Sequence, residues 1–174
     1  LNRAISTSEL YFRPATLTSD INKVSGESQL QFSMRLYADA SEGEVDQEKY
    51  IEYLYNFTGN DYMYDVTINI VNMQSIISTT SSSIDLRWSA DLLRQEISVD
   101  QFNGSTVYYK YYKDDVDYLS ESESDEEQIK TRLKWVSFKQ RFFSSTMIAK
   151  DFFEGGDLKT VDPHVISAKM GYSL

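Results

Sequence analysis

Few side chains in this sequence could do acid–base or metal chemistry. His164 is its single histidine and follows Asp162 and Pro163 in a turn-like setting, and we give an isolated histidine of this kind little weight as a functional group. The absence of cysteine excludes disulfides, thiolate metal sites and cysteine nucleophiles. No nucleophile elbow, zinc-binding H-E-x-x-H or phosphate-binding glycine loop occurs. We therefore predict no catalytic, cofactor-binding or metal-binding residue.

Carboxylates are numerous, so counting alone leaves open a pair that could hydrolyse a glycoside. Asp114, Asp115 and Asp117 flank the end of a predicted strand, however, and residues 120–127 read SESESDEE. Like charges at this density stay solvated, so we predict that 120–127 is an exposed, mobile loop. No segment has the alternating oxygen ligands around a glycine that a calcium loop needs.

Tyrosines offer one further binding chemistry, because exposed aromatic rings can stack on the pyranose rings of sugars. The predicted strand at 106–112 carries four of them, which project alternately from its two faces: Tyr108, Tyr109, Tyr111 and Tyr112. At least one pair should therefore face outward. We favour cross-strand packing over a ligand platform, since aromatic pairs stabilise sheets by about 0.2–1 kcal/mol each.

Length and charge narrow the class of protein. The chain has 174 residues, a net charge of −10 and 14% aromatic residues, which suits one domain with a sizeable core. Its apolar runs are far shorter than the roughly 20 residues that cross a bilayer. Its Lys and Arg residues are scattered singly, and an acidic surface repels phosphate, so we expect neither nucleic-acid binding nor peripheral membrane binding by a basic patch.

Alternation of apolar and polar residues predicts an all-β chain. Gly59, Asn60 and Asp61 form a predicted turn, 78–83 (STTSSS) a loop, and Pro14 is expected to interrupt a short strand over 9–13. A second turn is expected at Gly155 and Gly156. The predicted strands cover residues 30–37, 49–57, 62–72, 84–88, 106–112, 144–150 and 165–172.

One segment has helical spacing. Trp135, Phe138 and Phe142 recur at roughly helical intervals, with Lys134 and Lys139 on the other side, which predicts a short amphipathic helix over 135–143. A strand over 133–138 is the competing interpretation.

Four segments carry a resemblance to a known family. They are an aromatic strand, turn and strand at 50–73 (YIEYLYNFTGNDYMYDVTINIVNM), LRWS at 86–89, STVYYKYYKDD at 105–115, and KWVSFKQRFFSSTMIAKD at 134–151. The last is the most specific and is similar to a W-V-x-x-x-Q-x-Y/F-F-x-x-x-x-I pattern. In order and spacing these segments resemble the periplasmic domain of YidC-type membrane protein insertases, of the YidC/Oxa/Alb family.

The resemblance implies a fold and a domain. It implies a large twisted antiparallel β-super-sandwich, similar to galactose mutarotases. With the helix at 135–143 added, residues 1–174 would form a single periplasmic domain that lacks the first strands and the last part of the full domain.

The resemblance also implies a function. The domain would be a non-enzymatic part of an inner-membrane insertase and chaperone, on the periplasmic side of the bacterial inner membrane. Its partners, through the full-length protein, would be nascent membrane proteins and the Sec translocon, with contact loosely within 68–112. No individual partner-binding residue is implied. The alternative is an exported carbohydrate-binding β-sandwich that uses exposed tyrosines, and a sugar-converting enzyme on the same fold ranks third.

Overall fold

The computed structural model describes residues 5–15, 23–39, 45–78, 83–92, 105–161 and 165–173. These residues form antiparallel strands and a single 3-10 turn, η1 (Thr7–Glu9). The chain divides into two compact units, Leu1–Thr80 and Ser81–Leu174, and each is described by itself. The predicted all-β class is confirmed. Within the described ranges no helix is long and apolar enough to cross a membrane.

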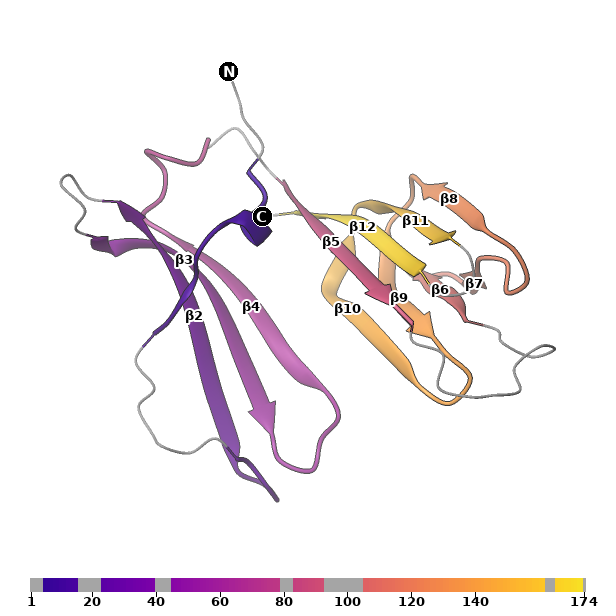
Figure 1. The fold of residues 1–174 in the computed structure, drawn as a ribbon, viewed down its shortest axis with the longest axis horizontal. Helices are drawn as coiled ribbons and strands as arrows, with labels where there is room; N and C mark the ends of the chain where they lie inside the picture. The colour runs from indigo at the N-terminus through magenta and orange to yellow at the C-terminus, as the bar shows by residue number, and fades with distance from the viewer. Residues whose placement is uncertain are drawn as a thin grey trace. The chain divides into compact units, whose positions relative to one another are not determined.

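The first unit is a four-stranded sheet in the order β1-β2-β3-β4 (Figure 1). Its strands are β1 (Arg13–Pro14), β2 (Gln29–Asp39), β3 (Val45–Thr58) and β4 (Tyr64–Val71). The strands predicted at 30–37, 49–57 and 62–72 are therefore confirmed, the last in shortened form.

The predicted turn between β3 and β4 is also confirmed. Asn60 has a φ of 59°, a left-handed conformation that Asn tolerates better than most residues. A Cβ atom on Gly59 would lie 2.4 Å from a backbone carbon of Ser25, so glycine is needed there for close approach. The expectation for Pro14 was wrong in detail: Pro14 lies within β1, opposite Met34 at the edge of the sheet, where a residue without an N–H is tolerated.

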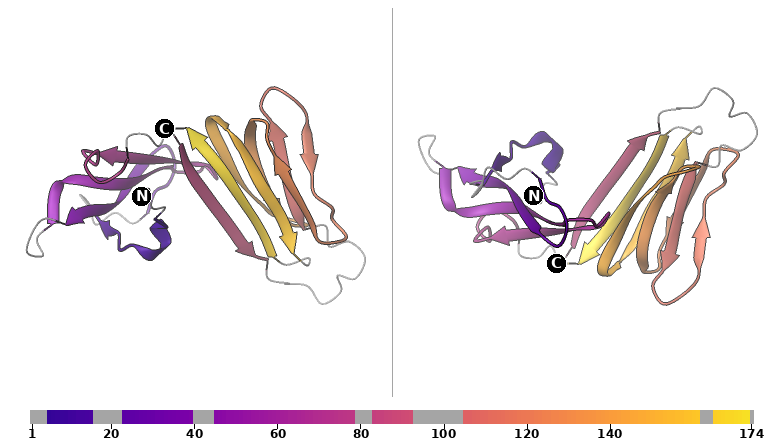
Figure 2. Two further views of the ribbon diagram at one scale, coloured as in Figure 1. Left: turned by 90° about the horizontal axis from the view of Figure 1, so that it is seen from above. Right: turned by 90° about the horizontal axis from the view of Figure 1, so that it is seen from below.

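The second unit contains two four-stranded sheets, in the orders β10-β9-β6-β7 and β5-β12-β11-β8. Figure 2 shows β5 and β12 side by side, as their nine-residue pairing from Val165↔Asp91 to Ser173↔Ser83 requires. The strand predictions at 84–88, 106–112, 144–150 and 165–172 are confirmed. The strands are β5 (Ser83–Asp91), β6 (Thr106–Tyr111), β7 (Val116–Tyr118), β8 (Asp125–Ile129), β9 (Leu133–Lys139), β10 (Ser144–Phe153), β11 (Gly155–Val161) and β12 (Val165–Ser173).

The two sheets of the second unit share one hydrophobic core. Trp88 of β5 stacks on Phe138 of β9, with ring centroids 3.8 Å apart and planes 12° apart, so the sheets meet face to face as in a β-sandwich. The core draws on both sheets, and its buried members are Val107, Tyr109, Leu119, Ile129, Leu133, Val136, Phe138, Ala149, Phe153, Leu158, Ile166, Ala168 and Met170.

The helix expected over 135–143 was wrong, and the competing strand is correct. β9 occupies the centre of its sheet between β10 and β6, and a central strand carries apolar residues on both faces. Phe138 faces the core, Trp135 alternates to the opposite face, and Phe142 lies in the turn before β10. The three aromatic residues are spaced as in a helix but lie on three different surfaces, and this spacing led to the wrong helix prediction.

Two further expectations were wrong in part. Residues 125–127 of the acidic segment belong to strand β8, where Glu126 pairs with Lys159 (2.8 Å) and Asp125 bonds to Thr160 of β11. An edge strand keeps one side in water and so accommodates these carboxylates. Gly155 and Gly156 begin strand β11 instead of forming a turn. Most of the loop predicted at 78–83 lies outside the described residues.

The sandwich packing predicts that replacing either of two phenylalanines, four residues apart, by alanine changes the free energy of unfolding by very different amounts. Phe138→Ala should lower the free energy of unfolding by about 3–5 kcal/mol, because the ring is 2% exposed and its removal leaves a cavity. Phe142→Ala should change it by less than about 0.5 kcal/mol, because that ring is 68% exposed. Urea unfolding followed by tryptophan emission measures both, since Trp88 and Trp135 lie in the second unit. Equal losses would contradict the strand assignment.

Candidate interaction surfaces

One face of the sheet in the first unit is apolar along three strands. Cross-strand partners share a face, and the pairing of β2, β3 and β4 brings twelve apolar or aromatic side chains together on one side. None of them is buried. They are Leu30, Phe32, Met34, Leu36, Ile51, Tyr53, Tyr55, Phe57, Tyr64, Val66, Ile68 and Ile70; we call this set the apolar face.

Aromatic stacking orders the apolar face. Phe57 stacks on Tyr64 of β4 with centroids 5.1 Å apart, and Phe12, from the segment before β1, stacks on Tyr53 at 4.8 Å. Tyr53 also donates a hydrogen bond to Thr7 (3.0 Å). The residues around η1 therefore cover one part of the face.

The opposite face of this sheet carries a polar network centred on Glu52. Its carboxylate accepts hydrogen bonds from Ser33 (2.6 Å), from Nε of Arg35 (2.8 Å) and from Asn69 (2.9 Å). Glu52 is 7% exposed. The Arg35 guanidinium also lies 4.3 Å from the ring centroid of Tyr50. The group links three strands through one carboxylate.

Two opposing effects act on the pKa of Glu52. Burial by itself would raise this pKa, but the hydrogen bonds from Ser33, Asn69 and Arg35, together with the Arg35 charge, outweigh burial and lower it below its ordinary value of 4.5. The arrangement binds an ionised carboxylate and leaves it no donor with which to act as an acid. Glu52 and Arg35 therefore form a structural ion pair.

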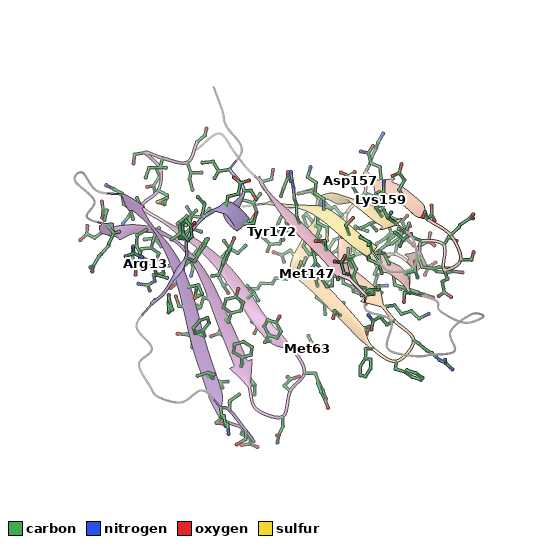
Figure 3. All side chains as sticks on the ribbon, viewed as in Figure 1. Arg13, Met63, Met147, Asp157, Lys159 and Tyr172 are labelled. Atoms are coloured by element: carbon green, nitrogen blue, oxygen red, sulfur yellow. The ribbon has the colours of Figure 1, made fainter. Side chains whose placement is uncertain are left out.

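In the second unit, the outer face of the β5-β12-β11-β8 sheet is charged. Lys159 pairs with Glu126 (2.8 Å) and Lys169 with Asp85 (3.2 Å), while Gln128 donates to Asp157 (3.1 Å). Figure 3 shows Asp157 and Lys159 on β11 at this surface. A shallow depression of about 820 Å³ lies here, but its charges of opposite sign largely satisfy one another, which gives it no strong preference for a ligand charge.

Three of the four tyrosines considered for stacking on a sugar are used in packing. Tyr109 is fully buried and donates a hydrogen bond to Glu127; burial, then this bond, raises its pKa well above the ordinary value. Tyr111 packs edge-on against Tyr109, and Tyr112 lies against Phe152.

The fourth tyrosine is on the outer face of its sheet. Tyr108 stacks on Tyr118 at 4.9 Å, donates to Glu121 (3.1 Å) and lies beneath the ammonium of Lys139. Its ring face is therefore already covered by protein. The packing interpretation accounts for all four residues.

The remaining candidates for chemistry do not assemble into a site. His164, together with Asp162 and Pro163, lies outside the described residues. Asp114 and Asp115 lie in the turn between β6 and β7, where their side chains and carbonyls bond locally. Across the described part of the chain, no three His, Asp or Glu side chains gather as a metal site would require.

The region 68–112 spans the end of β4, strands β5 and β6, and residues that are not described. Among the described strands, β6 lies between β9 and β7, whereas β5 lies at one edge of its sheet and β8 at the other. The outward side chains of β5 alternate with its core-facing ones: Asp85, Arg87, Ser89 and Asp91 are exposed. Within the described part of this region, β5 offers the longest accessible strand.

These surfaces are what the geometry supplies: an apolar sheet face, a polar network, a charged outer face and an edge strand. Comparison with known proteins gives them a context. The model of the YidC periplasmic domain matches residues 6–170. The chain belongs to the YidC periplasmic domain family.

Curated relatives agree with that assignment. The chain is 33% identical over 160 residues to the membrane protein insertase YidC of Parabacteroides distasonis, 33% identical over 159 residues to that of Porphyromonas gingivalis, and 30% identical over 158 residues to that of Bacteroides fragilis. Each match covers 90% of this chain and 22% or 23% of the relative. The chain thus spans less than a quarter of their length. No solved structure matches it.

Membership of this family confirms the resemblance read from 50–73, 86–89, 105–115 and 134–151, and it places the domain on the periplasmic side of the inner membrane. The Glu52 network was not anticipated from the sequence. Arg35 and Glu52 both fall on the polar side of their strands, but only the register, Arg35↔Glu52↔Asn69, brings them together.

The depressed pKa predicts a pH-dependent role for Glu52. A carboxyl whose pKa is lowered by folding stabilises the protein above its unfolded pKa, and that contribution is lost as pH falls through the folded value. Glu52→Gln should therefore destabilise the first unit at pH 7 by about 2 kcal/mol, and the difference from wild type should shrink below pH 4.5.

Amide hydrogen exchange in peptides from β2 and β3 measures this difference, because the tryptophans report only the second unit. Glu48→Gln is the matched control, since Glu48 lies on the same strand and is exposed. A loss that is constant from pH 7 to pH 3 would show that the ionised carboxylate contributes nothing.

Proposed function

We propose that this domain is a non-catalytic supporting and docking part of a membrane protein insertase that assists the insertion and folding of nascent membrane proteins. The observation that carries the proposal is the family match over residues 6–170. The curated relatives whose matches cover 90% of this chain are named membrane protein insertases. The insertion activity itself would reside in the rest of the full-length protein.

The side-chain chemistry supports a docking role. Glu52 is committed to a structural network and Tyr109 to the core, and Lys159 and Lys169 form ion pairs at the surface. A surface of this kind can be read by a protein partner through its pattern of charge and shape. Function is argued from these surfaces, because the fold alone would admit many activities.

We propose that the Sec translocon docks within 68–112 and contacts the outer side of β5. Within the described residues this strand is an edge strand, and its outward residues Asp85, Arg87 and Ser89 are exposed. Lys169 pairs with Asp85 (3.2 Å), whereas Arg87 forms no ion pair within the described residues, so the Arg87 cation is available to a partner carboxylate. An edge strand also permits strand addition.

Site-specific crosslinking tests this surface in the full-length insertase. A photo-crosslinking residue at Arg87 should capture a Sec translocon subunit in membranes, whereas the same residue at Asp117, on β7 of the other sheet, should not. Arg87→Glu should reduce co-purification of the translocon several-fold, mainly through slower association. Equal capture at both positions, or at neither, would refute docking on β5.

We further propose that residues 1–174 belong to one larger β-sandwich domain in which additional strands of the same polypeptide cover the apolar face. An amphipathic sheet is stable only when a second layer covers its apolar side. The twelve residues of the apolar face extend along three paired strands, and covering them needs a layer of similar size.

Exchange measurements on two lengths of chain test this arrangement. Amides of β3 and β4 should exchange at least tenfold more slowly in the full periplasmic domain than in residues 1–174, because a covered sheet opens less often. Amides of β9 and β6, already inside the sandwich, should be unchanged and serve as the control. Equal exchange of β3 and β4 in both lengths would contradict the proposal.

A further inference from the structure

The hairpin that joins β9 to β10 ends in two exposed aromatic rings. Phe142 is 68% exposed and Phe143 76% exposed, the highest values among the large apolar side chains described in the second unit. Neither ring contributes to the core. Exposing two adjacent phenylalanine rings to water costs free energy, and covering them would recover it. The tip is therefore a candidate binding surface.

The tip is a preorganised structure. The backbone N–H of Gln140 donates to the carbonyl of Phe143 (2.7 Å), and Ser144 pairs with Lys139 directly below the turn. β9 is held on both sides by β6 and β10. The rings are therefore carried beyond the end of a rigid sheet, with little conformational entropy left to lose on binding.

Cations and polar groups surround the two rings. The guanidinium of Arg141 lies 5.0 Å from the centroid of the Phe142 ring, and Lys139 at the base of the turn pairs with Glu121 (2.8 Å). Gln140, Ser144 and Ser145 complete the surroundings. The apolar surface of the tip is limited to these two rings, which polar side chains surround. Its area is far smaller than the roughly 800 Å² that each partner buries in a standard protein interface.

We propose that the 140–143 tip inserts its two phenylalanine rings into the interfacial region of a lipid bilayer. Aromatic rings concentrate at the boundary between membrane and water, and the long side chain of Arg141 can remain at headgroup level while the rings go deeper. Membership of the YidC periplasmic domain family places the domain beside the inner membrane. The proposal goes beyond partner docking and does not depend on it.

The charge of the chain determines the expected lipid dependence. With a net charge of −10, residues 1–174 are repelled by anionic headgroups. Ring insertion must therefore supply the attraction, and binding should persist on phosphatidylcholine vesicles and should not increase when phosphatidylglycerol is added. This distinguishes insertion from adsorption by a basic patch.

Residues 1–174 contain no cysteine, which allows a site-specific test with this chain. Ser144→Cys places an environment-sensitive fluorophore beside the tip and keeps both rings. Asp114→Cys places the same fluorophore at the opposite end of the sheet, since Thr106 pairs with Lys139 while Tyr111 pairs with Leu133. On adding phosphatidylcholine vesicles, emission from position 144 should shift to shorter wavelength, and emission from position 114 should not.

A matched variant assigns the shift to the rings. Phe142→Ser with Phe143→Ser in the Ser144→Cys background should abolish the shift and lower the vesicle partition coefficient about tenfold or more, while tryptophan emission confirms that the sandwich is intact. The proposal is overturned by no shift at position 144, by equal shifts at both positions, or by a shift that survives loss of the rings. A shift that grows with protein concentration without vesicles would instead identify a protein contact.

Discussion

The second unit depends on the burial of two sheet faces against each other. Trp88 and Phe138 meet across the interface at 3.8 Å, and the side chains of β5 and most of β12 alternate between the core and the outer face. Because each side chain on a strand changes face with every residue, a shift of register by one residue would expose the whole set. The sandwich therefore sets the position of every outer residue, including the cation of Arg87 and the aromatic hairpin tip.

The first unit obeys the same alternation with a different result. Its polar residues are satisfied on one face by the network around Glu52, whereas its apolar face gains only the partial cover of Phe12 and the residues near Thr7. The same alternation gives the second unit a buried core and leaves the twelve side chains of the apolar face outside the buried class in the first unit.

The described surfaces of this domain are suited to contact with other molecules. Several of its charged groups form ion pairs, its buried tyrosine is bonded to a carboxylate, and its exposed features include an edge strand, a sheet face and a hairpin tip. Each of these is a surface for contact with a larger object, whether protein or bilayer. Recognition of this kind needs rigid placement more than chemical reactivity, and antiparallel pairing supplies that placement.

The sequence by itself determined the all-β class, most strands and the family, because period-two alternation and the order of aromatic segments are local properties. It could not separate strand from helix at 135–143, since Trp135, Phe138 and Phe142 lie at helical spacing and only the sandwich assigns them to three different surfaces. Nor could it show that residues 125–127 form an edge strand, because their charges are accepted only through Lys159 and Thr160 on the neighbouring strand. The Glu52 network likewise needed the register of three strands. Tertiary structure decided these points because each depends on which residues lie opposite one another across strands distant in sequence.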